Sequence, residues 1–290
     1  MKEHRTLEYK ETVTNTFLKT VSAFANYGGG QIIFGIADNG TITGLENPEQ
    51  ACLDIENKIN DSIVPQPSYT LSVNYDKKTI CLTVKSGMSK PYLYKAKAYK
   101  RNDTATIEVD PYELRRLVLE GQHIDFEELA SEQQSLSFHT LERFLKKHAN
   151  IDVFNHDILK TLNLYSEQNG YNNAAAILAD DNQFPGIDIA KFGENINIIQ
   201  KRVTYTQMSI LNVYENTLQL YRDYYQYETI SGATRTLVER IPEAAFREAV
   251  ANALVHRTWD VTTHIQISMF DDRIEIVSPG GLPSGISEQE

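Results

Sequence analysis

The sequence predicts an α+β fold with more than one domain, and three observations indicate it. The chain has 290 residues, 41% hydrophobic and 23% charged, a globular composition long enough for two modest cores. Helix and strand periodicities alternate over residues 1–121, and a similar mixture returns from residue 171. The stretch between them is helical and acidic. We therefore expect a mixed α/β domain over 1–121, a helical connector over 122–170 and an α/β sandwich over 171–290.

The first domain begins with a helix and a strand pair. Apolar residues recur at helical spacing over 13–25, and the glycines that begin at Gly28 end this helix. An apolar strand is predicted over 31–37. Asp38-Asn39-Gly40 supplies a tight turn, after which residues 41–45 return as a second strand.

The rest of this domain adds two helices and another strand pair. Pro48 opens a helix whose isoleucines share one face. Alternating residues predict strands over 69–75 and 79–85. Asp110 and Pro111 are typical of the N-cap and first residue of a closing helix. We expect the strands to pair in a largely antiparallel way, as in α+β domains.

The later part of the chain contains more helix than strand. Two amphipathic helices are predicted around 138–145 and 158–164, and we interpret them as a spacer in preference to a winged-helix-like unit. A strand is predicted over 174–178. A long helix is predicted over 205–227, with apolar residues on the faces that would pack a core.

Charge is unevenly distributed along the chain. The formal net charge is −11, yet residues 1–121 hold 15 basic and 15 acidic residues and sum to zero. Within that half, residues 85–101 carry six cations and no acid, with tyrosines between them. Phosphate attracts such a cluster, and tyrosine rings stack on unpaired bases. The alternative is an edge strand guarded by lysines. The predicted nucleic-acid contacts are Lys90, Lys95, Lys97, Lys100, Arg101 and Tyr99.

The composition argues against several classes of protein. No apolar run is long enough to span a bilayer, and the N-terminus lacks the hydrophobic core of a secretory signal. Cys52 and Cys81 are typical of buried core residues rather than of a disulfide or metal pair. We expect a cytoplasmic protein that has no membrane partner.

One group of motifs is specific enough to suggest a family. Glu8-Tyr9-Lys10 is followed by Ala23-Phe24-Ala25-Asn26-Tyr27-Gly28-Gly29 and by Gly35-Ile36-Ala37-Asp38. This pattern resembles the AlbA-like domain that Schlafen proteins share with many bacterial regulators, and the resemblance extends over residues 3–117. It implies contact with DNA or RNA, and it adds Lys10 to the candidate nucleic-acid contacts.

The same resemblance implies an alternative, enzymatic function. Schlafen domains that cut RNA use three carboxylates, whose counterparts here are Glu3, Glu8 and Asp38. Clustered carboxylates hold Mg²⁺ or Mn²⁺, which activates water and stabilises charge on the phosphate. In this alternative Glu8 and Asp38 bind the metal, and the protein is a metal-dependent nuclease. Acids beside a turn also commonly cap it or face solvent.

A second group of motifs lies near the end of the sequence. Residues 247–257 read Arg-Glu-Ala-Val-Ala-Asn-Ala-Leu-Val-His-Arg. A predicted strand pair over 264–278 then leads to Pro279-Gly280-Gly281-Leu282-Pro283. This region, from about residue 171 onward, resembles the RecG-related, helicase-like regulators, a divergent branch of the GHKL ATPases. The expected fold is therefore an incomplete GHKL-like sandwich.

The spacing within this motif predicts a nucleotide site. Glu248, Asn252 and His256 are four residues apart, so they share one helix face, although a polar stripe of this kind also suits plain solvent exposure. In GHKL proteins the Asn ligates the Mg²⁺ on ATP and the Glu orients the attacking water. The resemblance therefore implies metal binding by Asn252 and catalysis by Glu248. The other expected ATP contacts are His256, Arg257, Gly280 and Gly281.

Two departures from the family pattern affect the expected activity. Ser278-Pro279 stand where GHKL proteins carry an Asp that reads adenine. The second glycine loop and the lid of the family would follow Glu290, so we expect weak ATP binding by this chain. Either the ATPase is a longer protein of which this chain is a part, or the natural protein has lost ATPase function.

The interpretation is a regulatory or defence protein of bacterial type, in which a nucleic-acid-binding domain is joined to an ATP-binding module. The first alternative is the metal-dependent nuclease described above. The second is a non-enzymatic interaction module that forms homodimers through its ATPase-like part.

Overall fold

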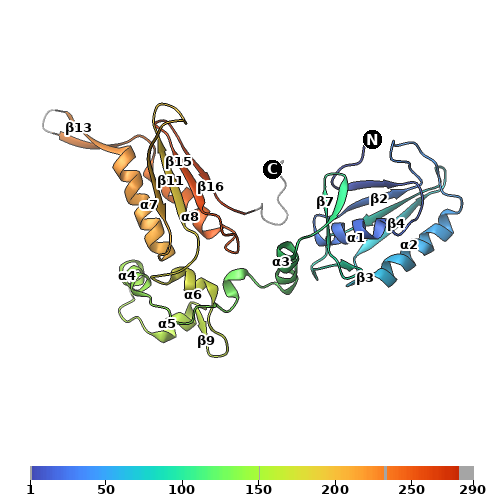
Figure 1. Ribbon diagram of the computed structural model, residues 1–290, viewed down its shortest axis with the longest axis horizontal. Coiled ribbons are helices and arrows are strands. Elements are labelled where there is room, and N and C mark those ends of the chain that lie inside the picture. Colours follow the sequence, from blue (N-terminus) through green and yellow to red (C-terminus); the bar gives the residue numbers. More distant parts are fainter. Residues whose placement is uncertain (1, 150, 232–233, 281–290) are drawn as a thin grey trace. The chain divides into compact units, whose positions relative to one another are not determined.

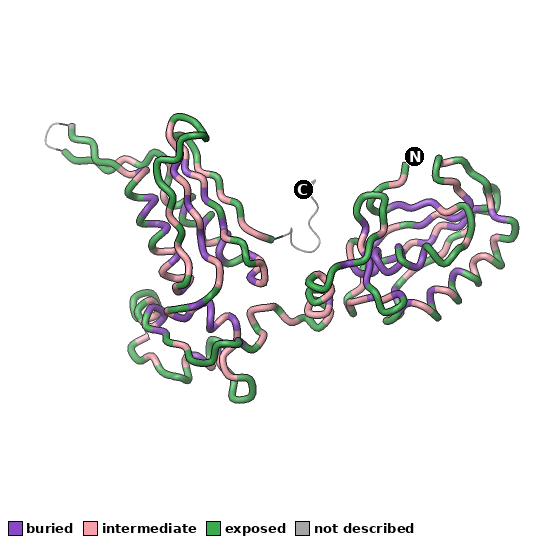
Figure 2. Tube along the Cα trace, in the orientation of Figure 1, coloured by how far each residue is buried: buried purple, intermediate pink, exposed green. Residues whose placement is uncertain are grey.

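The computed structural model describes residues 2–149, 151–231 and 234–280, and the chain divides into two units. Unit 1 is Met1–Asp125 and unit 2 is Phe126–Glu290. Buried residues form separate cores in the two units (Figure 2). Helices and strands are mixed in both, which confirms the predicted α+β fold class.

Unit 1 is built on a four-stranded sheet with the order β1-β2-β5-β4 (Figure 1). β1 (Leu7–Lys10) runs parallel to β2 (Gly30–Phe34). β5 (Thr79–Val84) pairs antiparallel with β2 and with β4 (Tyr69–Asn74). The strands predicted by alternation are confirmed. The parallel strand β1 has no counterpart among the predicted strands, because four residues are too few to show a period.

Two helices pack against the inner face of this sheet. α1 (Phe17–Asn26) is buried along almost its whole length, as the helical spacing predicts. α2 (Pro48–Ser62) begins at the predicted proline, and Asn47 caps it by accepting a hydrogen bond from the backbone N–H of Gln50. Each fully buried apolar side chain here contributes about 1.5–3 kcal/mol. The fully buried core residues include Phe17, Val21, Ile32, Phe34, Ile55, Ile59, Ile80 and Leu82.

Two short strand pairs and a third helix complete unit 1. β3 (Ile63–Val64) pairs with β6 (Leu93–Tyr94), and β7 (Tyr99–Asn102) pairs with β8 (Ala105–Glu108). α3 (Pro111–Gln122) is capped by the side chain of the preceding aspartate, which confirms the predicted cap. The predicted return strand over 41–45 is wrong: only one isolated bridge, Ile36 to Ile42, forms there.

Unit 2 begins with a small helical module that has its own core. Its elements are η1 (Phe126–Glu128), α4 (His139–His148), α5 (His156–Thr161), β9 (Tyr165–Ser166), β10 (Gly170–Tyr171) and α6 (Asn173–Leu178). The two predicted amphipathic helices correspond to α4 and α5. The predicted strand over 174–178 is wrong, because these residues form α6. Asn172 accepts a hydrogen bond from the Ala175 backbone N–H, and this cap together with three consecutive alanines favours helix.

The larger part of unit 2 is a second four-stranded sheet covered by two helices (Figure 1). Its strands, in spatial order, are β12 (Ile199–Tyr205), β11 (Ile187–Phe192), β15 (Ile265–Met269) and β16 (Ile274–Val277). α7 (Ile210–Tyr225) and α8 (Glu243–Val255) share a core with β11 and β15. The predicted terminal strand pair is confirmed as β15 and β16.

The long helix predicted over 205–227 is confirmed in a shorter form, α7. It begins after β12 and ends where a hairpin begins, formed by β13 (Gln226–Ser231) and β14 (Thr234–Glu239). This hairpin has no counterpart among the predicted elements. Across the described residues, every helix is too short or too polar to cross a lipid bilayer.

Candidate nucleic-acid and nucleotide sites

The most specific sequence motif of unit 1 fastens α1 to a distant backbone segment. The side chain of Asn26 is fully buried, and its amide nitrogen donates to the Tyr92 carbonyl at 2.9 Å. The backbone N–H of Tyr92 donates to Asn26 Oδ1 at 2.7 Å, and Ser22 Oγ also donates to the Tyr92 carbonyl at 2.7 Å. These bonds satisfy the buried side chains of α1 and the buried backbone N–H and carbonyl of Tyr92. Asn26 therefore has a structural role in this motif.

The glycines after α1 allow the chain to pass close to the sheet. Gly29 has φ +76°, and a Cβ there would lie 2.9 Å from the Val84 carbonyl oxygen. A Cβ on Gly30 would lie 2.6 Å from the Phe24 ring. Side chains at these positions would therefore separate β2 from α1 and β5.

Glu8 and Arg101 form a buried ion pair at the edge of the first sheet. Glu8 is 5% exposed, and its Oε2 accepts a hydrogen bond from Arg101 Nη1 at 2.8 Å. Its other oxygen lies 2.5 Å from Lys10 Nζ. Arg101 also donates to Thr106 Oγ1, and its guanidinium lies over the Phe24 ring. The carboxylate of Glu8 is thus already neutralised by two cations.

The structure does not bring the three predicted nuclease carboxylates together. Glu3 Oε1 accepts a hydrogen bond from the backbone N–H of Tyr9 at 2.7 Å, and Asp38 is exposed in the turn after β2. Within the described ranges, no three His, Cys, Asp or Glu side chains gather in a way that could hold a metal ion. The residues present therefore do not fit the Mg²⁺ or Mn²⁺ site of the nuclease alternative.

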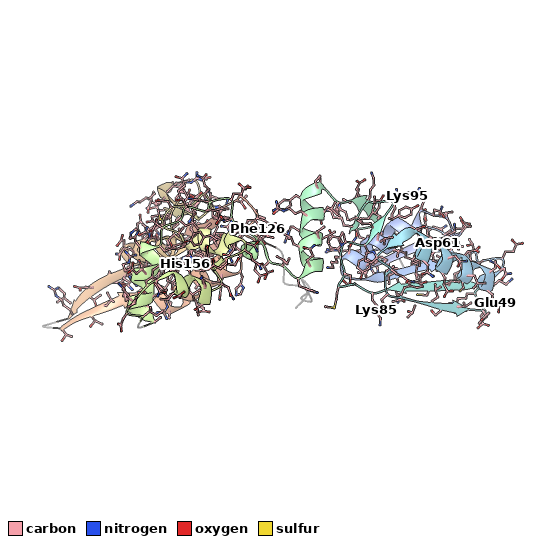
Figure 3. The ribbon with its side chains drawn as sticks, turned by 90° about the horizontal axis from the view of Figure 1, so that it is seen from below. Glu49, Asp61, Lys85, Lys95, Phe126 and His156 are labelled. Atoms are coloured by element: carbon pink, nitrogen blue, oxygen red, sulfur yellow. The ribbon has the colours of Figure 1, made fainter. Side chains whose placement is uncertain are left out.

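Most of the predicted nucleic-acid contacts are already paired with acidic side chains. The observed pairs are Lys10–Glu8, Lys90–Glu120, Lys97–Glu108, Lys100–Glu113 and Arg101–Glu8. Tyr99 is buried, so its ring is not presented to a base. Lys95 is exposed, and Lys85 of the same sequence run is exposed as well; both are labelled on unit 1 in Figure 3. Local sequence therefore overstates the free positive charge of residues 85–101.

A smaller group of cations surrounds the Tyr94 and Tyr99 rings. Lys19 Nζ of α1 lies 5.7 Å from the Tyr99 ring centroid, and Lys95 Nζ lies 5.4 Å from that of Tyr94. Burial and the nearby Glu108 raise the pKa of Tyr99, and Lys97 and Lys95 partly oppose this. We call Lys19, Lys95 and Lys97 the basic cluster. Lys19 is missing from the sequence prediction because it lies on a helix about eighty positions away.

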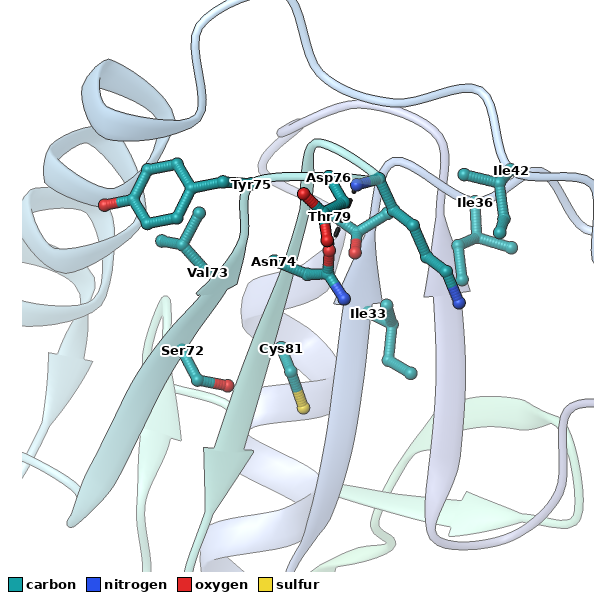
Figure 4. Close-up of a pocket in the computed structure, with 11 residues that line it drawn as sticks. Ile33, Ile36, Ile42, Ser72, Val73, Asn74, Tyr75, Asp76, Thr79 and Cys81 are labelled. Carbon is teal, nitrogen blue, oxygen red and sulfur yellow. Dashed lines mark hydrogen bonds between the residues drawn. The ribbon is translucent and has the colours of Figure 1, made fainter.

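Unit 1 also has an open hollow of about 680 Å³ beside the turn that joins β4 and β5 (Figure 4). Its lining combines Ile33, Ile36 and Ile42 with polar groups that include Ser72 and Asn74. Among the described residues, none of the predicted site residues lines it.

In unit 2, α8 presents the predicted polar face to solvent. Glu248 and Asn252 are both exposed, and the Asn252 amide nitrogen donates to Glu248 Oε1 at 3.2 Å. His256 is the C-cap residue of the same helix and is also exposed. Phe246 and Leu254 are buried on the opposite side of the helix, against the sheet. The predicted shared helix face is confirmed for Glu248 and Asn252.

The turn after β16 is held against the C-terminal end of α8. Ser278 Oγ donates to the Ala253 carbonyl at 3.0 Å, and the backbone N–H of Thr258 donates to the Pro279 carbonyl at 2.9 Å. Gly280 has φ +151°, and a Cβ there would lie 2.8 Å from Thr258 Oγ1. Only glycine fits this close approach. Gly281, the other predicted glycine contact, lies outside the described residues.

Arg257 does not reach the exposed face of α8. Its side chain is buried and donates to the carbonyls of Pro185, Val261 and Thr263. The guanidinium lies 4.6 Å from the Trp259 ring centroid, and burial lowers the pKa of Arg257 to about 10. Its role is to hold the loop at Val261–Thr263 and the backbone at Pro185 together, so the structure does not support the predicted phosphate contact.

Family comparisons match each unit separately. Residues 3–110 match the family described as "Schlafen, AlbA_2". Unit 1 carries a Schlafen AlbA_2 domain. Residues 262–290 match the family described as "Putative ATP-dependent DNA helicase recG C-terminal". Both resemblances predicted from sequence are confirmed.

The two matches cover different parts of the candidate sites. The AlbA_2 match contains the Glu8–Arg101 pair and the basic cluster, and it ends at the cap of α3. The RecG-related match contains β15, β16 and the Gly280 turn. α8 precedes that match, so the assignment of Glu248 and Asn252 depends on their motif alone.

Comparison with solved structures concerns the fold alone. The DIP2311 protein from Corynebacterium diphtheriae is similar over 98% of this chain, with a TM-score of 0.51 and 18% identity. This chain spans 63% of the length of that structure. The N-terminal domain of a RecG-related protein from Nitrosomonas europaea aligns with 36% of this chain and 78% of its own, at 21% identity and a TM-score of 0.26. No curated protein matches this chain in sequence.

Proposed function

We propose that the protein binds DNA or RNA through its AlbA_2 domain and responds to ATP through its RecG-related segment. The observation that carries this proposal is the exposed Glu248–Asn252 pair on α8, beside a glycine turn that is fixed to the same helix. A regulatory role suits this combination, because a nucleotide site can bias a nucleic-acid-binding module in the same chain.

The polar face of α8 supports nucleotide binding in a specific way. The Asn252 amide nitrogen faces Glu248, which leaves Asn252 Oδ1 as an oxygen ligand of the kind that Mg²⁺ prefers. Glu248 is exposed beside it and is placed to orient a water molecule. The glycine turn brings backbone close to the end of the helix, where an anionic ligand could be contacted without side-chain interference.

The residue at position 278 of the turn lowers the affinity that we expect for ATP. Ser278 stands where related ATPases carry an Asp, and its hydroxyl already donates to the Ala253 carbonyl. A hydroxyl held in this way does not replace a carboxylate that reads the adenine amino group. Losing one charge-assisted hydrogen bond costs about 1.5–3 kcal/mol, which corresponds to a roughly ten- to hundredfold weaker Kd.

Nucleic-acid binding is supported by the basic cluster more than by the paired cations around it. Both side chains of the Lys97–Glu108 pair are exposed, and a surface ion pair of this kind contributes only about 0–1 kcal/mol to stability. A phosphate can therefore replace Glu108 at small cost. Lys19 and Lys95 already lie over tyrosine rings, so their side chains are directed to the same part of the surface.

Calorimetric titration with ATP and Mg²⁺ tests the nucleotide part of the proposal. We expect weak binding in the high micromolar to millimolar range, abolished in Asn252→Ala and preserved in Glu248→Gln. Arg247→Ala changes an exposed residue of the same helix and serves as the matched control. Equal ATP affinity in the native chain and in Asn252→Ala would place the nucleotide elsewhere.

A further inference from the structure

The β13–β14 hairpin extends from unit 2 beyond the end of α7 (Figure 1). Six residue pairs join its strands in continuous register, from Gln226–Glu239 to Ser231–Thr234, without a bulge. All of its described side chains are exposed or half-buried. We call residues 226–231 and 234–239 the arm. A two-stranded hairpin with no covering layer is marginally stable in water, so the arm gains much from a partner.

The base of the arm is fixed to the two helices that flank it. The backbone N–H of Arg240 donates to the Tyr225 carbonyl at 2.9 Å, at the end of α7. Gln226 Nε2 donates to Glu243 Oε2 at 2.6 Å, and the backbone N–H of Glu243 donates to Glu239 Oε2 at 2.9 Å. The direction of the arm is therefore set by α7 and α8, which present it as a defined surface.

One face of the arm combines apolar side chains with a balanced pair of charges. The register places Leu237 opposite Glu228 and Ile230 opposite Arg235. Ile230 is 69% exposed and Leu237 is 58% exposed, whereas Arg235 Nη1 lies 3.3 Å from Glu228 Oε2. Two large aliphatic side chains side by side on an open strand pair are typical of a surface that another strand or sheet covers.

Both outer edges of the arm are open for strand pairing. Natural proteins protect such edges with lysines, prolines or bulges, and the described residues of the arm contain none of these. We propose that the arm pairs edge to edge with the arm of a second copy of this chain, which makes a four-stranded sheet about a twofold axis.

Charge favours a second copy over other partners at this place. The whole chain has a net charge of −11, so most of its surface repels another copy. The arm holds only Glu228, Glu239 and Arg235 as charged residues. When β14 pairs with its own copy about Thr236, Arg235 faces a leucine and no like charges meet. The same holds for β13 about Thr229. Two acids and one arginine do not attract the phosphates of a nucleic acid.

The oligomeric state of the full chain, measured by analytical ultracentrifugation without nucleotide or nucleic acid, tests the proposal. We expect a dimer whose Kd rises at least tenfold in the double variant Ile230→Lys/Leu237→Lys. Both side chains are exposed, so the fold should be retained, and circular dichroism checks this. Val153→Lys is the matched control, because Val153 is 68% exposed and lies outside the arm.

Cysteine cross-linking locates the axis independently. In a Cys52→Ser/Cys81→Ser background, Thr229→Cys and Thr236→Cys each place a thiol where twofold pairing sets the residue opposite its own copy, within disulfide range. A disulfide-linked dimer with either variant supports the proposal. A chain that stays monomeric, or a dimer unaffected by the double lysine variant, overturns it. A double variant that changes oligonucleotide affinity in a monomeric chain assigns the arm to nucleic acid and also overturns it.

Discussion

Arg101 Nη1 lies 2.8 Å from Glu8 Oε2 and joins two residues that are 93 positions apart in the chain. In the sequence, Glu8 belongs to a candidate metal-binding triad and Arg101 to a candidate phosphate-binding run. In the structure, each charge is the partner of the other, inside the AlbA_2 domain. The expected metal binding by Glu8 and the expected phosphate binding by Arg101 are thus replaced by one buried ion pair, which we expect to contribute to the stability of unit 1.

Removing either partner of this pair should destabilise unit 1. Arg101→Met leaves Glu8 buried with only Lys10 beside it, and loss of one partner of a buried pair costs about 3–5 kcal/mol. Chemical denaturation followed by circular dichroism measures the change. Lys97→Met breaks an exposed pair instead and should cost less than about 1 kcal/mol. Equal effects of the two substitutions would contradict the structural role of Arg101.

The amide of Asn26 should be indispensable to the same unit. Asn26→Asp keeps the acceptor for the Tyr92 N–H but loses the donor to the Tyr92 carbonyl and introduces a buried charge. We expect the free energy of unfolding to fall by about 1–3 kcal/mol or more. Asn39→Asp makes the same chemical change in an exposed turn and is the control. A stability loss no greater than that of the control would show that the hydrogen bonds between Asn26 and Tyr92 contribute little to stability.

Local signals in the sequence predict the elements whose causes are local. Asp110 and Pro111 identify the start of α3 because a cap and the residue after it are adjacent. The strand predicted over 174–178 is wrong because its apolar run carries no period, and the Asn172 cap decides for helix. The arm escapes prediction because Tyr227 and Ile230 are three residues apart, a helical spacing that continues the tyrosine-rich pattern of α7.

The candidate sites are predicted unequally for a similar reason. Glu248 and Asn252 are found because four-residue spacing on one helix is visible in the sequence. The cations of residues 85–101 are misjudged because their acidic partners, such as Glu113 and Glu120, lie on α3. Lys19 joins the basic cluster only through folding, which no local pattern reveals.

The basic cluster should determine the salt dependence of nucleic-acid binding. Lys19→Glu or Lys95→Glu removes one phosphate contact, so the slope of log Kobs against log salt should fall in magnitude by about 0.7–0.9 per contact. Fluorescence anisotropy with a labelled oligonucleotide across a salt series measures the slope. Lys77→Glu changes the net charge equally, at an exposed position outside the cluster. If Lys77→Glu weakens binding as much as the others, the contact surface lies elsewhere.

Acid should weaken unit 2 through Asp180. Burial tends to raise the pKa of this carboxyl, but hydrogen bonds from the backbone N–H groups of Thr140 and His139, each 2.8 Å long, outweigh burial and hold the pKa well below its usual 3.8. Because the folded-state pKa is depressed, the stabilisation is fully present above about pH 4 and is lost as the pH falls further.

The substitution Asp180→Asn tests whether this carboxylate causes the loss of stability in acid. It keeps one acceptor oxygen for the first turn of α4. We expect it to cost about 0.5–2 kcal/mol at neutral pH and to reduce the loss of stability that occurs as the pH falls below about 4. Trp259, the single tryptophan of the chain, is buried in unit 2, so its fluorescence reports the unfolding of this unit. Asp181→Asn alters the exposed neighbour and should leave the acid dependence unchanged. Parallel pH profiles for the native chain and Asp180→Asn would mean that another carboxylate governs acid unfolding.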